Sequence, residues 1–158
     1  MSKIYVDEIA GIASADTVAI PGHVIQVVQD VDVTRAQISS TSYTPVHASQ
    51  TITPTSASSK ILVHLNFGIN DNTTSDVNSY ITIFRDATTN LGDSNYGLAR
   101  FRATTTRLES MGSIMYLDSP ATTSEVTYAM YAKVNSGTFE FPGPVGMPTT
   151  LTLMEIAG

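Results

Sequence analysis

The 158-residue chain is acidic, free of cysteine and poor in charged side chains, and these properties exclude several classes of protein. Its 8 basic and 14 acidic residues give a formal net charge of −6, whereas binding a nucleic-acid backbone requires concentrated Lys and Arg. Without cysteine there can be no disulfide, thiolate nucleophile or cysteine metal site. We therefore expect no nucleic-acid partner and a single domain long enough to bury its own core.

The sequence also argues against a membrane segment and a secretory leader. No apolar run approaches the roughly 18 residues that a spanning helix needs. Near the N-terminus Asp7 and Glu8 stand where a signal peptide requires an uninterrupted apolar stretch. We expect no membrane insertion and no signal peptide.

Residues 1–22 differ from the rest of the chain and end at Pro21-Gly22. Their apolar side chains, Ile4, Val6, Ile9 and Ile12 among them, fit neither a strand period nor a helix period. The segment is too apolar for a solvated tail and too thin for a core of its own. We interpret it as an extended arm whose isoleucines and valine anchor it on a partner. An edge strand packed on the chain's own domain is the alternative.

The clearest element of the main body is the stretch 58–69, in which apolar residues recur at every second position. Because side chains alternate across a strand, this spacing predicts a core strand with one buried face and one mostly polar face. The residues expected on the buried face are Ile61, Val63, Leu65, Phe67 and Ile69. Lys60, His64 and Asn66 are expected on the polar face.

Turn-forming residues divide the rest of the body into short strands with no convincing helix. We expect Thr44-Pro45 to separate two strands and Gly112 to mark a bulge. Position 126 and every second residue after it to 134 should share one face. The expected strands cover residues 23–33, 34–43, 48–53, 79–86, 99–108, 110–117, 125–135, 138–141 and 149–157.

This series of strands predicts the fold class and the domain organisation. Eight to ten short strands spaced by turns are typical of an all-β protein, here an antiparallel β-sandwich with an extended N-terminal arm. The sequence leaves a jelly-roll-like and an immunoglobulin-like sandwich open. We expect the arm at 1–22 and the sandwich domain at 23–158.

A search for reactive groups finds no pattern that indicates an enzyme. His23, His47 and His64 each lack a neighbour at metal-ligand spacing, and no serine lies in a G-x-S-x-G turn. The oxygen-rich stretch 71–76 lacks the glycine and glutamate of an EF-hand loop, so we interpret it as a solvated loop. We expect no catalytic residue, no cofactor and no metal.

Three arginines, Arg100, Arg102 and Arg107, surround Phe101. Such a group could contact a polyanion, but the net negative charge opposes that interpretation. We expect these arginines to be solvated or paired with carboxylates.

Several segments together resemble small virion proteins of tailed bacteriophages, especially marine and cyanobacterial phages. The likeness extends over nearly the whole chain, and its segments are structural signatures that carry no catalytic or ligand residue. The segments are 23–29 (HVIQVVQ), 52–63 (ITPTSASSKILV), 84–86 (FRD) with 90–92 (NLG), 151–158 (LTLMEIAG) and, in the arm, 3–9 (KIYVDEI).

The resemblance implies a non-enzymatic tail-fibre or fibre-tip protein, commonly trimeric, that the arm anchors to other virion proteins. The sandwich would then face outward for host-surface contact, with a host cell-surface glycan as a further partner. The protein would be made in the host cytoplasm and become part of the virion. A capsid decoration protein is an alternative. A carbohydrate-binding module of another assembly is the second alternative, although the chain has no Trp.

Overall fold

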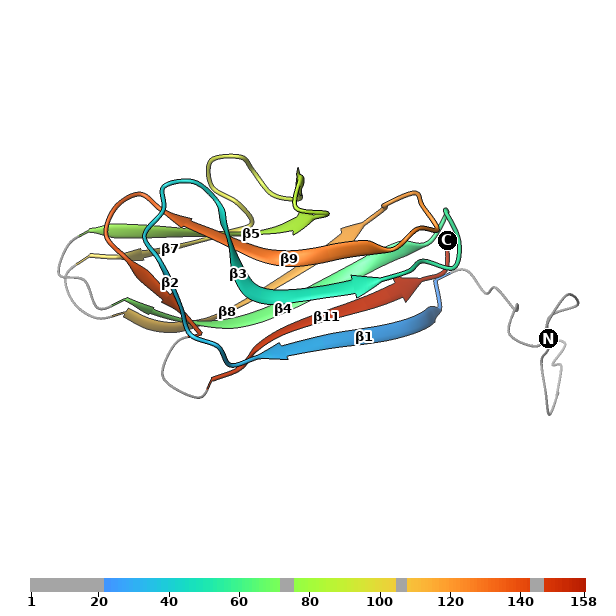
Figure 1. The fold of residues 1–158 in the computed structure, drawn as a ribbon, viewed down its shortest axis with the longest axis horizontal. Coiled ribbons are helices and arrows are strands. Elements are labelled where there is room, and N and C mark those ends of the chain that lie inside the picture. The colour runs from blue at the N-terminus through green and yellow to red at the C-terminus, as the bar shows by residue number, and fades with distance from the viewer. Residues whose placement is uncertain (1–21, 72–75, 105–107, 143–146) are drawn as a thin grey trace, which may run out of the picture.

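A computed structural model describes residues 22–71, 76–104, 108–142 and 147–158 (Figure 1). The described residues form strands and no helix, so the predicted all-β class is confirmed. The arm, with Ile4, Val6, Ile9 and Ile12, lies outside the described residues. The eleven strands of the described part are β1 (Val24–Asp32), β2 (Ala36–Ile38), β3 (Thr44–Ile52), β4 (Lys60–Asp71), β5 (Val77–Arg85), β6 (Thr89–Asn90), β7 (Ala99–Ala103), β8 (Leu108–Asp118), β9 (Val126–Val134), β10 (Phe139–Phe141) and β11 (Thr149–Ile156).

The strands form two antiparallel sheets packed face to face (Figure 1). Sheet A has the order β1-β11-β4-β8, and the short strands β10 and β2 extend it beside the far end of β4. Sheet B has the order β3-β9-β5-β7, with β6 beside the end of β5. Gly22 donates its amide to the Ala157 carbonyl at 2.8 Å, so the described chain begins and ends at the same end of the sandwich.

The connectivity is that of a jelly roll. Among the eight longest strands the first pairs with the last (β1 with β11), the second with the seventh (β3 with β9), the third with the sixth (β4 with β8) and the fourth with the fifth (β5 with β7). This pairing is a long hairpin rolled into two sheets. An immunoglobulin sandwich divides its strands differently between the sheets, so the structure decides between the two arrangements that the sequence left open.

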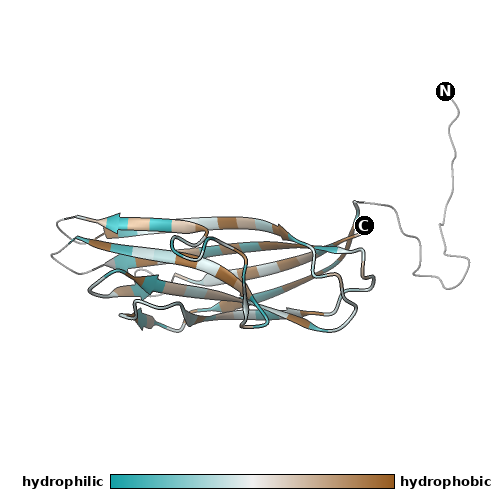
Figure 2. Cartoon of the chain, turned by 90° about the horizontal axis from the view of Figure 1, so that it is seen from above, coloured by the Kyte–Doolittle hydropathy of each residue, from teal (hydrophilic) through white to brown (hydrophobic). Residues whose placement is uncertain are grey.

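Alternation along the strands explains the core, and Figure 2 shows hydrophobic positions recurring along both sheets. The five residues predicted for the buried face of β4 are all fully buried, which confirms that prediction. The same holds on β9, where five alternate residues point inward and are at most 4% exposed: Val126, Tyr128, Met130, Ala132 and Val134. Burying each large apolar side chain between the facing sheets contributes about 1.5–3 kcal/mol of transfer free energy.

Two local predictions were wrong. Pro45 does not separate two strands but lies within β3, which is an edge strand of sheet B and so tolerates a residue without an N–H. Gly112 is not a bulge, because the register between β4 and β8 is continuous across it. A side chain at this position would meet aromatic rings instead, since an added Cβ would lie 2.7 Å from Cε2 of Phe67 and 3.0 Å from Cζ of Phe101.

A buried polar bridge joins the two sheets. Asp118 at the end of β8 accepts hydrogen bonds from Arg85 of β5 at 2.6 Å and from the Tyr128 hydroxyl of β9 at 2.7 Å. Burial, followed by the bond to Asp118, raises the pKa of Tyr128 well above its usual value. The hydroxyl therefore remains a donor at neutral pH, and the bridge ties sheet A to sheet B through satisfied groups.

Candidate functional site

A concave surface lies on the outer side of sheet B, where β3 bulges away from β9. Pro45 is opposite Tyr131 and Ser49 is opposite Ala129, so β3 has three residues between these pairs where β9 has one. The backbone amide of Ser49 is satisfied from the other sheet by Asp30, at 3.0 Å. Bulges of this kind redirect side chains and are frequent beside functional sites.

A tight turn closes the opposite side of this surface. Asp86 and Ala87 both have left-handed backbones, with φ of 52° and 57°, which is the pattern of a type I′ hairpin turn between β5 and β6. The Thr127 amide donates to Asp86 Oδ1 and the Asp86 amide donates to the Thr127 carbonyl, each at 2.8 Å. The Asp86 carboxylate is therefore held in one orientation, with Oδ2 free of bonds to the described residues.

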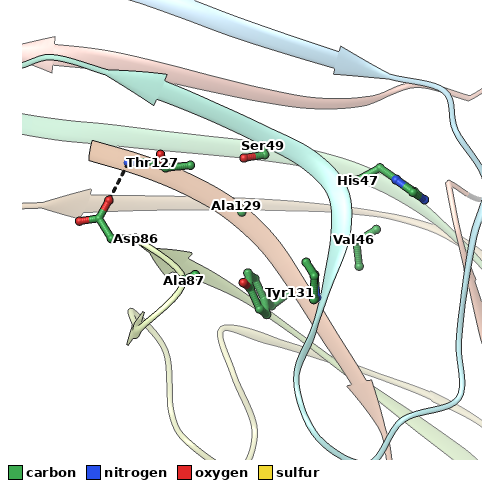
Figure 3. Close-up of a pocket in the computed structure, with 9 residues that line it drawn as sticks. Val46, His47, Ser49, Asp86, Ala87, Thr127, Ala129 and Tyr131 are labelled. Atoms are coloured by element: carbon green, nitrogen blue, oxygen red, sulfur yellow. Dashed lines mark hydrogen bonds between the residues drawn. The ribbon is translucent and has the colours of Figure 1, made fainter. Parts of the chain in front are cut away.

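Between the bulge and the turn lies an open hollow of about 600 Å³ (Figure 3). Its floor is apolar, and its rim carries a carboxylate, two aliphatic hydroxyls, an imidazole and a phenol. The lining residues are Pro45, Val46, His47 and Ser49 from β3, Asp86 and Ala87 from the turn, and Thr127, Ala129 and Tyr131 from β9.

Aromatic side chains continue the hollow along the outer face of sheet B. Tyr131 lies against Phe84, with ring centroids 4.2 Å apart, and Phe84 contacts Tyr43 at 6.0 Å. Tyr80 contacts Tyr96 at 6.0 Å. We call these five residues the aromatic cluster; their rings provide flat apolar surface next to a polar rim.

The ammonium group of Lys133 lies over two rings of the aromatic cluster, those of Tyr43 and Tyr80. Its Nζ is 4.4 Å from the ring centre of Tyr43 and 5.6 Å from that of Tyr80, and it donates to the Ser94 carbonyl at 3.2 Å. Burial, with a smaller contribution from Asp93, raises the pKa of Tyr43 to about 12. The Tyr43 hydroxyl therefore stays protonated at neutral pH, and the positive charge over the rings is stabilised by cation–π attraction.

The groups around the hollow include an imidazole, a hydroxyl and a carboxylate, but they are not linked to one another. His47, Ser49 and Asp86 all line the hollow, yet no hydrogen bond links His47 to either of the other two, and Figure 3 shows His47 pointing away from Asp86. A nucleophile–base–acid set requires such bonds. An aromatic ring beside a carboxylate and hydroxyls instead matches the two sides of a sugar, which presents an apolar C–H face and hydroxyl groups.

The residues that the sequence singled out are dispersed over the structure. The histidines lie apart on β3, on β4 and before β1, and His64 Nε2 is 3.1 Å from the Ser113 hydroxyl. No group of three or more His, Cys, Asp or Glu side chains within the described ranges could hold a metal ion. Most of the oxygen-rich stretch 71–76 lies outside the described residues.

The prediction of carboxylate pairing is confirmed for Arg102. Its guanidinium donates twice to Asp76, at 2.8 and 2.6 Å, and this bond lowers the pKa of the exposed carboxyl. Arg100 is exposed, and Arg107 lies outside the described residues. Asp76 therefore partly neutralises the positive charge of Arg102.

The sequence did not reveal the hollow or the aromatic cluster. Three of the five aromatic residues, Tyr80, Phe84 and Tyr131, fall in the stretches 79–86 and 125–135, but nothing local shows that these strands pair or that a bulge lies opposite Tyr131. The sequence feature that points to the cluster is Tyr80-x-x-x-Phe84 together with Tyr131-x-Lys133. It can be recognised only when the pairing between β5 and β9 is known.

Comparison with known proteins adds no relative. No family model matches the chain, and no curated protein is significantly similar to it. The part of the chain that the structure describes contains no helix long and apolar enough to cross a membrane.

Proposed function

We propose that the protein is a non-enzymatic structural component of a bacteriophage virion, of the tail-fibre or fibre-tip type. Residues 1–22 attach it to other virion proteins, the sandwich faces outward for host-surface contact, and the assembled form is a homotrimer. The chain is made in the host cytoplasm and resides in the virion.

The proposal rests on where the segments that resemble phage virion proteins lie in the fold. The segments 23–29, 52–63 and 151–158 contribute to β1, β4 and β11, which are three neighbouring strands of sheet A. They meet at Glu155, a fully buried carboxylate. Glu155 accepts bonds from Gln26 at 2.6 Å and from the amide and hydroxyl of Thr55, both at 2.7 Å. Segments distant in sequence therefore form one interlocked unit, as expected if they are the signature of one scaffold.

The point at which the arm joins the sandwich suits attachment. Residues 1–21 join the sandwich at Gly22, beside the C-terminus and at the end of the long axis of the molecule (Figure 1). The hollow and the aromatic cluster lie on a side face instead, so an anchored arm leaves them accessible. Ordering an arm costs roughly 1–2 kcal/mol per residue in backbone entropy, which added strand pairing or trimeric avidity must offset.

Truncation tests the attachment role. A chain that starts at His23 should stay folded, with an unchanged circular dichroism spectrum, and lose its place on the particle. The full-length chain, added to particles that lack the protein, is the control. Normal occupancy of particles by the truncated chain would contradict the anchor, and an unfolded truncated chain would assign the arm to the domain.

The hollow favours a second candidate function, a carbohydrate-binding module of another assembly. Asp86→Asn keeps the acceptor oxygen for the Thr127 amide and tolerates the left-handed backbone, but it removes the carboxylate charge. For a sugar site we expect at least about tenfold weaker glycan binding in a calorimetric titration. Unchanged binding by Asp86→Asn, or no glycan binding by the wild type, would count against this candidate.

A further inference from the structure

The outer face of sheet A is covered by exposed apolar side chains. On the two outermost long strands, β1 and β8, the residues that point away from the core are 46–65% exposed: Val24, Val27 and Val31 on β1, and Met111, Met115 and Leu117 on β8. Leu62 of β4 with Met154 and Ile156 of β11 lie partly buried between them. We call these nine residues the apolar face. Exposed apolar side chains gathered on one side of a sheet are typical of an interaction site on soluble proteins.

The strand register aligns part of this face in a row. Leu117 pairs with Leu62, Leu62 with Met154, and Met154 with Val27, so one apolar side chain from each of the four strands lies side by side. All four alternate with core residues and so share the outer side of the sheet. A row across the full width of a sheet is a surface that a flat apolar partner can cover.

The polar residues of the same side of the sheet bond to one another. Each pair joins neighbouring strands, so these groups retain a partner when water is removed, which lowers the cost of burying the face. The pairs are Gln29 with Thr152 at 2.8 Å, His64 with Ser113 at 3.1 Å and Asn66 with Thr150 at 3.4 Å.

Charge is confined to the two ends of this side of the sheet. Among the described residues of the four strands, Lys60 lies at one end and Glu109 at the other, where Glu140 of β10 pairs with Arg35. None of the nine residues of the apolar face is charged, so two copies can meet across it without burying a charged group.

Part of the outer side of sheet B is covered by its own chain. The amides of Leu91 and Leu98 bond to carbonyls of Ile83 and Ile81 at 2.9 and 2.8 Å, which lays the segment between β6 and β7 beside β5. Thr82, on the outer side of β5, is fully buried as a result. Within the described part of the chain, the apolar face has no such cover.

We propose that the apolar face is the surface through which copies of this chain associate. β8 has 11 residues, and at about 3.4 Å per residue and about 4.8 Å per strand the whole outer side of the four strands, polar residues included, measures at most roughly 37 by 19 Å, or about 700 Å². A stable protein–protein interface buries about 800 Å² per partner. The outer side of sheet A is therefore comparable in size to one partner's share of such an interface, and facing sheets are an ordinary way to bury such surfaces.

The dimensions also fit the homotrimer, and in this respect the inference rests on the proposed function. Three faces about 19 Å wide that enclose a threefold axis parallel to the strands leave about 5–6 Å between the axis and each sheet. That distance is half of the roughly 10 Å at which side chains fill the space between facing sheets. Three copies would thus bury the row from Leu117 to Val27 without a large void.

A charge placed on the apolar face tests the inference in the full-length chain. Met115 is 64% exposed, so Met115→Glu should leave the sandwich folded, while burying the carboxylate at an interface should weaken association at least about tenfold. Tyr96→Glu is the matched control, because Tyr96 is 59% exposed in the segment between β6 and β7, which joins two strands of the other sheet. Light scattering gives the mass, and circular dichroism confirms folding.

The expected result is an oligomer for the wild type and for Tyr96→Glu, and a shift toward 16.9 kDa for Met115→Glu. If Met115→Glu keeps the wild-type mass, the apolar face is not the interface, although the homotrimer stands. If the wild type itself is a 16.9 kDa monomer, both the interface and the homotrimer are wrong. The virion role is judged separately by attachment to particles.

Cross-linking gives a second measurement that does not depend on the glutamate variant. The chain has no cysteine, so Met115→Cys and Tyr96→Cys each carry one thiol. A bis-maleimide should join copies of Met115→Cys and leave Tyr96→Cys as single chains. Equal cross-linking of the two variants would overturn the assignment of the face.

Discussion

Gly112 shows how the absence of one side chain sets the packing inside sheet A. A Cβ here would lie 2.7 Å from Cε2 of Phe67, a fully buried ring that cannot move aside easily. Gly112→Ala should therefore lower the free energy of unfolding by about 1–3 kcal/mol, through overpacking.

Urea unfolding at a fixed protein concentration measures this effect. Thr123→Ala, at an exposed position between β8 and β9, is the control and should change stability by less than about 0.5 kcal/mol. Equal stability of Gly112→Ala and the wild type would show that the glycine has no packing role.

Glu155 makes the stability of the sandwich depend on pH. Burial opposes the charged form, but the hydrogen bonds from Gln26 and Thr55 outweigh it and hold the pKa of Glu155 below its usual value. A lowered folded-state pKa stabilises the protein above the unfolded pKa of about 4.3. This stabilisation is lost as the pH falls through the folded pKa.

Urea midpoints between pH 3 and 7 should therefore fall on the acid side of about pH 4.3. Glu155→Gln should be less stable than the wild type at pH 7 and should lose less stability on acidification. Parallel pH profiles for the two proteins would show that Glu155 does not contribute.

At the scale of single elements, β4 has two faces with different roles. Leu65 is fully buried against sheet B, so Leu65→Asp should destabilise the fold by at least about 3 kcal/mol, because it places an unpaired charge in the core. Leu62 is on the outer side, and Leu62→Asp should cost less in unfolding and act mainly on association. Similar losses of folding stability at both positions would contradict this division.

The turn between β5 and β6 is a strained element beside the hollow. Ala87 has φ of 57°, which costs roughly 1–2 kcal/mol for a residue with a Cβ. Ala87→Gly relieves this strain but adds freedom to the unfolded chain, so we expect stabilisation of up to about 1 kcal/mol. Thermal unfolding measures the change, and a lower melting temperature would show that Ala87 has a packing role that outweighs its backbone.

The elements also show how far the sequence could be interpreted. β4 and β9 were predictable in position and in their buried faces, because strict alternation of apolar residues is a local property. β3 was not, since Pro45 suggested a break that an edge strand tolerates. Gly112 suggested a bulge because an isolated glycine within a strand often marks one. Its packing role depends on Phe67 of β4 and Phe101 of β7, which the residues around Gly112 do not reveal.

For the whole molecule, the sequence predicted an antiparallel sandwich but not its connectivity or its surfaces. Pairing of β1 with β11 brings together residues more than 100 positions apart, which no local pattern encodes. The stretch 79–86 carries apolar groups on both sides, a pattern that favours an uncovered face and hence an oligomer. The structure buries Thr82 on the outer side of this strand and places most of the exposed large apolar residues on the outer side of sheet A.

The central claim is that this chain is part of a virion, and the most direct test is its presence in purified particles. Peptide mass spectrometry on density-purified particles, from a host that carries the gene, should find the chain in a fixed ratio to the major capsid protein. The copy number should be a multiple of three. Recovery of the chain only in the particle-free lysate would contradict the account.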